Sequence, residues 1–407
     1  MVSLSAPLKD KRVGVIGFNA RPIACSAKKA GAHVIVSDYW GDDDLSACCD
    51  KWVAILTPKA GDRQRQPLDV PLYEGLVENL YYLAKERKLD HVIVGSGFDD
   101  HVDALVPLYE AGLLIGCTTN QMKKARDFSS LAKLAKKHEI RFPKRETART
   151  PDEVLEISAA IDFPYLVRPT HSGGGSGIRL VRNPPDITRA FGEPEGGEYE
   201  PRIVQEYVPG VDISCSVLAA KDIAITVSVQ GQLIGMPTAG RNCGFAYCGN
   251  YYPSRLSADF VSRISEVSES ICSELKLNGS VGLDFVIDKS NQIWLMEVNP
   301  RIQGTLELIE SASDISMTNL HTNASNDVLP EKIPEIRPGV KMIVYSRRDG
   351  VVPNLSGYSN TVDRTPPGVM VNMRDPICTV IEVGGSMMEC YRRASETASA
   401  IQREVSI

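Results

Sequence analysis

Two carboxylates and an amide are spaced so that they can meet on adjoining strands. Asp284 lies in one apolar stretch, Glu297 and Asn299 lie in the next, and the polar turn 289–292 joins the two stretches. If the hairpin is centred in the middle of this turn, Asp284 faces Glu297, and Asn299 lies on the same side two residues further on. Such oxygen ligands suit Mg²⁺ or Mn²⁺ held against phosphates, because a cation removes the repulsion between the carboxylates. The alternative is a polar outer face of an amphipathic hairpin, which explains less well why Glu297 interrupts the apolar alternation.

A glycine-rich segment, 171–177, lies between the apolar runs 165–167 and 178–181, which predicts a hairpin with a long flexible loop. Glycines let backbone N–H groups approach phosphate oxygens, and small hydroxyl side chains add donors. Arg168 precedes the loop and can bind two phosphate oxygens. A Walker loop is excluded because no Gly-Lys-Ser/Thr ends the segment, and a linker or plain surface loop is the alternative. The candidate phosphate-binding residues are Arg168, Ser172, Gly173, Gly174, Gly175 and Ser176.

Between these motifs, a break separates two predicted strands. The strand 203–207 meets Pro209 and Gly210, and a long alternating strand follows. Such a break is typical of a hinge between two sheets. Polar side chains at a hinge can hold a planar base and its sugar hydroxyls, and Gln205, Glu206 and Asp212 bracket this one.

Taken in order, these motifs resemble the ATP-grasp superfamily, in particular its carboxylate–amine ligase branch, which is related to biotin carboxylase and carbamoyl-phosphate synthetase. The resemblance covers most of the chain, from about residue 10 to residue 407. It implies ATP and Mg²⁺ (or Mn²⁺) as cofactors and a mixed α/β and α+β fold. The implied parts are a Rossmann-like pre-ATP-grasp domain at 1–118, a two-lobed ATP-grasp domain at 119–329, and a linker with a small C-terminal β-rich domain at 330–407.

The resemblance also implies roles for individual residues. Arg168 stands where the family usually has a lysine against the α- and β-phosphates, and Arg301 lies beside the transferred phosphoryl group. The remaining matches are an adenine hinge of Gln205, Glu206, Tyr207 and Val208, a ribose acceptor at Asp212, and metal ligands at Asp284, Glu297 and Asn299.

One position departs from the family pattern. Many members carry an Asp-Lys pair whose lysine touches the α-phosphate, whereas here Phe128 follows Asp127. Arg126, Lys124 and Lys123 are the candidates to replace the missing charge.

The chain begins with a strand–helix–strand pattern that ends in Asp38. An acid at this distance is also typical of dinucleotide-binding proteins, but only Gly14 and Gly17 of the three expected glycines are present. In ATP-grasp proteins a preceding domain of this kind usually forms part of the acceptor-substrate site, and Arg21 and Asp99 would face it. Ordinary roles in βα turns are the alternative for both residues.

Composition limits the class of protein. A length of 407 residues predicts two or three domains, and a net charge of −6 argues against a nucleic-acid partner. No apolar run is long enough to span a bilayer, so we expect no membrane partner and a cytoplasmic location. The ten cysteines include no Cys-x-x-Cys pair, which predicts reduced and mostly buried thiols. Cys243 and Cys248 share one loop and are the only pair for which a redox or metal role is considered.

Together the motifs predict an ATP- and Mg²⁺-dependent ligase. The γ-phosphate would pass to a small-molecule carboxylate to form an acyl phosphate, which an amine would then attack. Arg168 and Arg301 would neutralise the developing charge while the glycine-rich loop excludes water. Two alternatives stay open: a carboxylase that forms carboxyphosphate from bicarbonate, and a nucleotide-binding sensor without catalysis. The C-terminal domain is a candidate for forming a homodimer.

Overall fold

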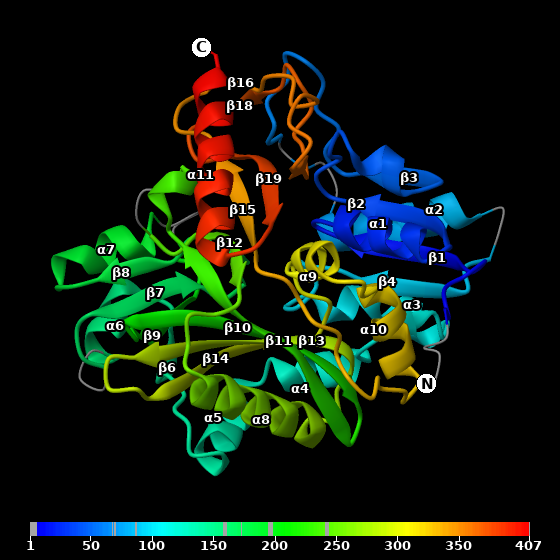
Figure 1. Ribbon diagram of the computed structural model, residues 1–407. Helices are drawn as coiled ribbons and strands as arrows, with labels where there is room; N and C mark the ends of the chain where they lie inside the picture. The colour runs from blue at the N-terminus through cyan, green and yellow to red at the C-terminus, as the bar shows by residue number, and fades with distance from the viewer. Residues whose placement is uncertain are drawn as a thin grey trace.

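The computed structural model describes residues 6–66, 68, 71–85, 88–157, 161–171, 173–193, 198–240 and 244–406. Within these ranges the strands form four sheets, of five, eight, four and two strands (Figure 1). No helix in these ranges is long and apolar enough to cross a membrane.

The N-terminal sheet is parallel and has the strand order β3-β2-β1-β4-β5. Its strands are short apolar runs, as expected for a sheet that is covered on both faces. They are β1 (Arg12–Gly17), β2 (His33–Asp38), β3 (Lys51–Ala54), β4 (His91–Val94) and β5 (Leu114–Ile115). Helix α1 (Arg21–Lys29) packs with Val13 and Val15, whereas α2 (Leu72–Ala84) packs with Ile16 on the other side. The expected Rossmann-like architecture is confirmed. The connecting elements are η1 (Leu45–Cys48), η2 (Val102–Leu105) and α3 (Val106–Glu110).

Two helices lead from this sheet to the rest of the chain, α4 (Thr119–Ala125) and α5 (Phe128–Lys137). Helix α4 begins with a capping box between Thr118 and Gln121. Asp127 caps α5 by accepting a hydrogen bond from the Ser130 N–H at 2.7 Å. The two residues on either side of this cap, Arg126 and Phe128, are therefore held at a defined point between the helices.

The small antiparallel sheet has the strand order β6-β9-β7-β8. It consists of β6 (Arg145–Ala148), β7 (Tyr165–Pro169), β8 (Arg179–Val181) and β9 (Arg202–Glu206), and α6 (Pro151–Ile157) and α7 (Pro185–Phe191) pack on it. Strands β7 and β8 pair with Tyr165 opposite Val181, which confirms the hairpin around the glycine-rich loop.

The large sheet has the order β14-β13-β10-β11-β12-β15-β19-β17. Its strands are β10 (Gly210–Ala220), β11 (Ile223–Ile234), β12 (Tyr247–Tyr252), β13 (Asn278–Asp288), β14 (Ile293–Asn299), β15 (Gly339–Tyr345), β17 (Thr361–Val362) and β19 (Pro376–Val383). The associated helices are η3 (Pro237–Ala239), α8 (Ala258–Glu274), α9 (Leu306–Ala312), α10 (Met317–Ser325) and α11 (Met387–Glu404). The two-stranded sheet pairs β16 (Gly350–Val351) with β18 (Met370–Val371).

The C-terminal segment is β-rich, as expected, but its main strands extend the large sheet. Strand β15 pairs with β12, and β19 pairs with β15. Helix α11 packs on these strands through Ala394, Ala398 and Ile401. The division of the chain at residues 118 and 329 stays a prediction.

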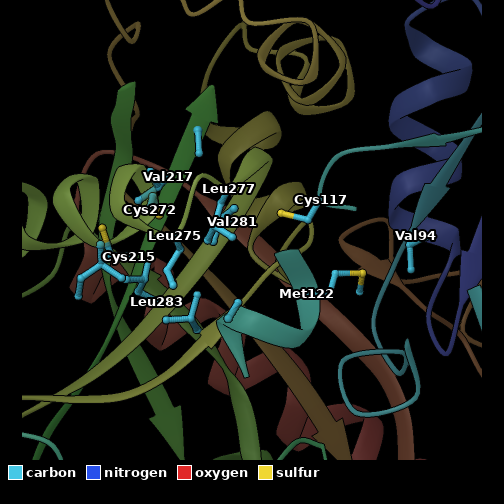
Figure 2. Packing of buried hydrophobic residues seen from close by; sticks show 14 of the residues in the cluster. Val94, Cys117, Met122, Cys215, Val217, Cys272, Leu275, Leu277, Val281 and Leu283 are labelled. Atoms are coloured by element: carbon cyan, nitrogen blue, oxygen red, sulfur yellow. The ribbon is translucent and has the colours of Figure 1, made fainter. Parts of the chain in front are cut away.

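One hydrophobic cluster connects the N-terminal sheet with the large sheet. Val94, Cys117 and Met122 from the N-terminal side belong to the same cluster as Cys215 and Leu283 from β10 and β13 (Figure 2). Burying apolar surface across this junction stabilises the relative placement of the two sheets.

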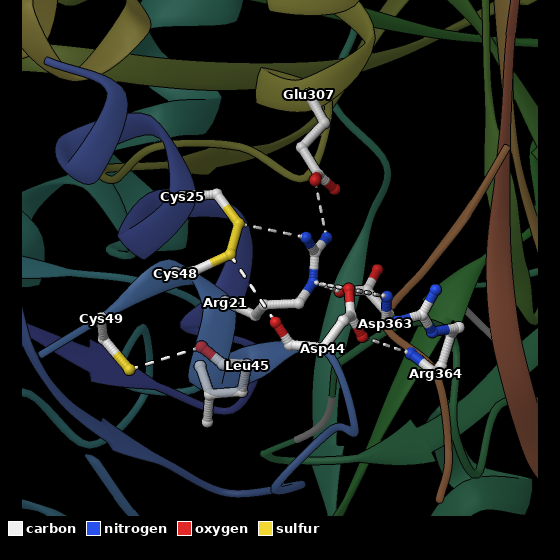
Figure 3. Close-up of a disulfide and its surroundings, with 9 residues drawn as sticks. All are labelled: Arg21, Cys25, Asp44, Leu45, Cys48, Cys49, Glu307, Asp363 and Arg364. Carbon is white, nitrogen blue, oxygen red and sulfur yellow. Dashed lines mark hydrogen bonds and ion pairs between the residues drawn. A yellow bond between two sulfur atoms is a disulfide. The ribbon is translucent and has the colours of Figure 1, made fainter. Parts of the chain in front are cut away.

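Cys25 of α1 and Cys48 of η1 form a disulfide, with their Cα atoms 4.4 Å apart (Figure 3). The prediction of reduced thiols is therefore wrong for this pair, because the fold brings together two cysteines that are 23 positions apart in the sequence. Cys248 is a buried thiol that donates a hydrogen bond to the Ala246 carbonyl at 3.4 Å, and Cys243 lies outside the described residues, so the role considered for that pair stays untested.

Candidate active site

The β13–β14 hairpin places Asp284 directly opposite Glu297, as predicted. The route to this pairing differs from the prediction. Phe285 lies opposite Leu295, so the turn is centred on residue 290 and not between residues 290 and 291 as expected. A β-bulge at the next position leaves Met296 as an extra residue and restores the pairing of the two carboxylates.

Asn299 connects the two carboxylates. Its Nδ2 donates hydrogen bonds to Asp284 Oδ2 at 3.1 Å and to Glu297 Oε1 at 3.2 Å. Gln232 Nε2 donates to the other oxygen of Asp284 at 3.0 Å. The residues predicted as metal ligands are thus gathered on one side of the hairpin, with polar hydrogen atoms between the two acids.

The electrostatics of this pair are asymmetric. Burial, followed by the charge of Glu297, raises the pKa of Asp284 to about 8. Burial also acts to raise the pKa of Glu297, but the charges of Arg126 and Arg168 outweigh it and lower that pKa to about 2. Near neutral pH the two carboxyl groups therefore carry one negative charge in total. A bound cation would favour loss of the remaining proton, so that both would be charged.

The donor set fits a cation that is also bound by phosphates. Within the described residues, no group of three or more His, Cys, Asp and Glu side chains could hold a metal ion by itself. Two carboxylates and one amide match the small number of protein ligands that Mg²⁺ takes when substrate phosphates complete its coordination. The amide of Asn299 must then turn its oxygen toward the ion.

Three arginines from different elements converge on Glu297. Arg126, between α4 and α5, lies 3.3 Å from Glu297 Oε2 and 2.9 Å from Asp100 Oδ1. Arg168, near the end of β7, and Arg145, on β6, also interact electrostatically with Glu297. The negative charge of Glu297 acts to raise the pKa of both guanidinium groups, against the effect of burial. The Arg145 guanidinium lies 4.4 Å from the centre of the Phe128 ring, and that of Arg168 lies 6.0 Å from it.

Arg145 and Arg168 have hydrogen-bond donors without a partner. Among the described residues, nothing accepts a hydrogen bond from the buried Nε and Nη1 of Arg145 or from the buried Nε of Arg168. Burial, followed by the neighbouring Arg168, lowers the pKa of Arg145 to about 9. Buried polar groups in proteins are nearly always hydrogen-bonded, so orphaned guanidinium N–H groups indicate a site for an anion.

Arg145 was missed by the sequence analysis. An isolated arginine near the start of a short strand belongs to no motif, and its position over Phe128 depends on tertiary packing. Of the three residues considered as replacements for the missing lysine, Arg126 is at the site, whereas Lys123 pairs with exposed Asp103 at 2.6 Å. Lys124 is exposed.

The predicted hinge lies between the two antiparallel sheets. Strand β9 ends the small sheet at Glu206, and β10 starts in the large sheet at Gly210. Gln205 is buried, and within the described chain its Oε1 has no hydrogen-bond partner. Asp212 is half-buried, and burial raises its pKa to about 6.

Two further hinge residues lie between apolar and aromatic groups. Val208 is buried in a small cluster with Val286 and Trp294. The Tyr207 ring contacts the Phe245 ring edge-on, with centroids 6.0 Å apart. Glu206 is engaged with the backbone, since its Oε2 accepts a hydrogen bond from the Lys144 N–H at 3.0 Å. The hinge therefore offers an apolar surface, a free amide oxygen and a carboxylate within one short stretch.

The glycine-rich loop rests against the large sheet. The Gly174 carbonyl accepts a hydrogen bond from the Tyr247 N–H at 3.0 Å. Gly175 has a φ of +75°, and a Cβ atom there would collide with the Phe245 carbonyl, so only glycine fits. Gly173 and Ser176 also lie in this loop, whereas Ser172 lies outside the described residues.

Arg301 and Asp99 meet as a pair, but Arg21 lies elsewhere. Arg301 Nε binds both oxygens of Asp99, at 3.1 and 2.9 Å.

The expectation that Arg21 faces an open substrate site is wrong. Arg21 is only 2% exposed and pairs with Asp363 at 2.7 Å and Glu307 at 2.6 Å (Figure 3). Carboxylates from α9 and the C-terminal segment thus neutralise it and fix it inside the protein.

Asp38 does not fit the dinucleotide alternative. It is fully buried and accepts hydrogen bonds from the N–H groups of Ala20, Trp40 and Gly41 at 2.7 to 2.9 Å. A carboxylate that is already used by the backbone is not available to ribose hydroxyls, so the structure disfavours NAD binding at this strand.

Comparisons with known proteins agree with this architecture. Residues 126–305 match the ATP-grasp domain family. The chain is 28% identical over 264 residues to the carbamoyl phosphate synthase large chain, C-terminal section, of Methanopyrus kandleri, covering 64% of this chain and 48% of that protein. It thus spans about half the length of that relative. It is also 27% identical over 373 residues to an uncharacterized protein of Methanocaldococcus jannaschii, covering 90% of this chain and 87% of that protein.

Solved structures share the fold over nearly the whole chain. An ADP complex of N5-carboxyaminoimidazole ribonucleotide synthetase has a TM-score of 0.71 at 15% identity and covers 98% of this chain and 99% of its own. The biotin carboxylase domain dimer of Hydrogenobacter thermophilus 2-oxoglutarate carboxylase, with MgADP and bicarbonate, has a TM-score of 0.72 at 17% identity. The match covers 95% of this chain and 90% of that one. Residues 126–305 thus form a domain of the ATP-grasp family, and the chain as a whole shares the fold of these two structures.

Proposed function

We propose that this protein is an ATP- and Mg²⁺-dependent ligase that activates a small-molecule carboxylate as an acyl phosphate for attack by an amine. One observation carries the proposal. Arg145 and Arg168, whose buried N–H groups include some without a partner among the described residues, lie near a hairpin that holds two opposed carboxylates and an amide. Buried N–H groups without an acceptor and two opposed carboxylates are each costly, and a magnesium-bound polyphosphate would satisfy both sets of groups.

Each group has a role in this proposal. Mg²⁺, or Mn²⁺, would be held by Asp284, Glu297 and Asn299 and would neutralise phosphate charge. Arg126, Arg145 and Arg168 would bind the phosphates, with Arg145 supplying the charge that Phe128 lacks. The remaining contacts to the nucleotide would come from Gln205, Glu206, Tyr207 and Val208 around the base, Asp212 at the ribose, and Ser172, Gly173, Gly174, Gly175 and Ser176 over the γ-phosphate.

The chemistry needs positioning more than a general base. A substrate carboxylate oxygen attacks the γ-phosphorus, and the bond to ADP breaks. The amine lone pair then attacks the acyl carbon, inorganic phosphate leaves, and the amine proton passes to solvent. Arg301, oriented by Asp99, would stabilise charge on the transferred group, while the glycine-rich loop keeps water from the acyl phosphate.

A carboxylase that forms carboxyphosphate is the second candidate, and it differs only in using bicarbonate as the carboxylate. The sensor alternative loses its main motivation, because Arg145 lies over the ring that replaces the missing lysine. The homodimer stays a proposal, supported by the dimeric biotin carboxylase domain of similar fold.

The test is ADP release by the purified protein with ATP and Mg²⁺ across a panel of acids and amines. An acid alone should yield a hydroxamate when hydroxylamine is added, because hydroxylamine captures acyl phosphates. Loss of turnover on removal of bicarbonate alone would identify the carboxylase instead. Arg168→Lys should retain measurable turnover, whereas Arg168→Ala should lose it, since charge is needed first and bidentate geometry second. ATP binding without ADP release under any condition would contradict the proposal.

A further inference from the structure

A series of aromatic rings lies at the carboxyl edge of the N-terminal sheet. We name it the ring ladder, and it consists of Trp40, Tyr39, Phe18, Tyr73 and His101. The rings come from the segments that follow β1, β2 and β4 and from the start of α2. In open parallel sheets this edge is where ligands bind.

Most neighbours in the ring ladder are stacked nearly parallel. The centroids of Tyr73 and His101 are 3.7 Å apart with planes at 17°, and those of Phe18 and Tyr73 are 5.8 Å apart at 13°. Phe18 and Tyr39 are 5.0 Å apart at 25°. Gly97 makes this arrangement possible, because a Cβ atom there would lie 2.5 Å from the Phe18 ring.

The ring ladder is only partly buried. Phe98, which contacts Tyr73 edge-on, is fully buried as an ordinary core residue. Phe18, Tyr39, Tyr73 and His101, in contrast, all keep part of their surface exposed. Four stacked rings that stay partly open at a ligand-binding edge are unusual for packing alone, since burial of their remaining surface would be favourable.

The ring ladder lies beside the proposed reaction site. The segment after β4 carries Phe98, Asp99, Asp100 and His101 in succession, and its two acids bind Arg301 and Arg126. Tyr73 is close enough that, after burial, the charges of Asp100 and Asp99 raise the pKa of its hydroxyl.

The glycine-rich loop contacts the ring ladder at the end formed by His101. The His171 ring lies 5.1 Å from that of His101 with planes at 47°. His171 is exposed, so the loop contacts the ring ladder at the surface of the protein. A substrate held here would have stacked rings on one side and the charged site at Arg301 on another.

We infer that one of the two substrates carries a planar aromatic or heteroaromatic ring, which stacks on the ring ladder while its reacting carboxylate or amine lies toward Arg301. This inference rests on the proposed ligase function. A flat aromatic ring can pack face to face or edge to face against the exposed parts of these rings, whereas a saturated ring of the same size lacks the π-system that favours such contacts. The ring ladder would thus select the substrate, and the reaction would take place beside Arg301.

The experiment compares matched probes that differ only in ring saturation. Phenylacetate is paired with cyclohexylacetate, and phenethylamine with cyclohexylethylamine, each at millimolar concentration with ADP and Mg²⁺. Saturation-transfer NMR should show at least tenfold stronger binding of the aromatic member of one pair. The same member should support ADP release with the lower KM when ATP replaces ADP.

Variants connect this selectivity to the ring ladder. Tyr73→Leu and, separately, Phe18→Leu should remove the preference for the aromatic probe and raise its KM more than they lower kcat. Tyr82→Leu is the control, because Tyr82 lies on the same helix and is 63% exposed. It should change neither quantity. A thermal melt identifies a variant that fails to fold. If one of the two variants does so, the remaining variant tests the inference.

Several outcomes would overturn the inference. These are equal binding of the aromatic and saturated probes, no binding of either aromatic probe, or a preference that survives in Tyr73→Leu and Phe18→Leu. Failure of the ligase proposal would look different. The aromatic preference would persist and depend on Tyr73, yet no acid or amine would elicit ADP release or a hydroxamate.

Discussion

At Glu297 a single carboxylate both attracts Arg126 and repels Asp284. Glu297→Gln should lower ADP release by about 100-fold or more, because the cation loses a charged ligand. The thermal midpoint without ligands should stay close to that of the wild type, because Asp284 loses a repelling neighbour whereas Arg126 and Arg168 lose an attracting one. Glu266→Gln, at a 63% exposed side chain, is the control for turnover and melting. Unchanged turnover in Glu297→Gln would refute the metal assignment.

Arg145 gives a second prediction at this scale. Arg145→Met should weaken ATP binding by roughly 10- to 100-fold, as expected when charge-assisted hydrogen bonds are lost. The protein without ligands should be at least as stable, because burial and Arg168 disfavour the charge of Arg145. Calorimetric titration and thermal melting measure the two effects.

Arg141→Met is the matched control. Arg141 also lies over an aromatic ring, that of Trp294 at 5.5 Å, but it is exposed. If both variants bind ATP like the wild type, Arg145 has no part in phosphate binding.

Residues that belong to a pattern could be predicted from the sequence, and isolated residues could not. The alternation around Asp284 and Glu297 was enough to pair them, although a bulge rather than the assumed turn centre makes the pairing. Arg145 depends on the packing of β6 against Phe128, which no local pattern encodes. The Cys25–Cys48 disulfide was missed for the same reason.

At the scale of elements, we expect the hinge between β9 and β10 to position the nucleotide. If Asp212 accepts the ribose hydroxyls, Asp212→Ala should weaken ATP by roughly 1–3 kcal/mol, the typical value of a hydrogen bond to a charged group. Calorimetry with ATP measures this loss, and exposed Asp314→Ala serves as the control. NAD should give no binding signal. Micromolar NAD affinity would favour the dinucleotide alternative, and unchanged ATP affinity would remove Asp212 from the site.

Elements set by local signals were predicted well, and their long-range partners were not. Proline and glycine at 209 and 210 mark the break between two strands, and the structure confirms that these belong to different sheets. The pairing of β12 with β15 joins residues about 90 positions apart, and nothing in either strand specifies that partner. The C-terminal strands could therefore be recognised as strands but not assigned to the large sheet.

At the scale of the whole molecule, the site is assembled from parts that must keep their relative positions. Arg126 and Asp99 come from the N-terminal side, whereas Glu297 and Arg301 come from the large sheet. A shared hydrophobic cluster holds these parts together. His321 on α10 adds a polar connection between them. Its Nδ1 accepts a hydrogen bond from the Ser280 N–H of β13 at 2.8 Å, and its Nε2 lies 3.2 Å from the Ile115 carbonyl of β5.

The connection at His321 should make stability depend on pH. Burial lowers the pKa of His321 from 6.5 to about 4, so the neutral ring belongs to the folded state. Below pH 6.5 the unfolded chain binds a proton that the folded protein does not take up, and stability falls as the pH drops toward 4. The loss amounts to roughly 2 kcal/mol between pH 7.5 and pH 5.

The corresponding variant is His321→Asn, whose amide oxygen can still accept from Ser280 but does not titrate. It should be less stable than the wild type at pH 7.5 because packing is lost, yet its disadvantage should shrink by roughly 2 kcal/mol at pH 5. Urea unfolding at both pH values measures the difference, and buried carboxylates cancel because both proteins contain them. Exposed His33→Asn is the control for replacing a histidine at the surface. Parallel pH profiles for wild type and His321→Asn would mean that the ring is not held neutral between the two sheets.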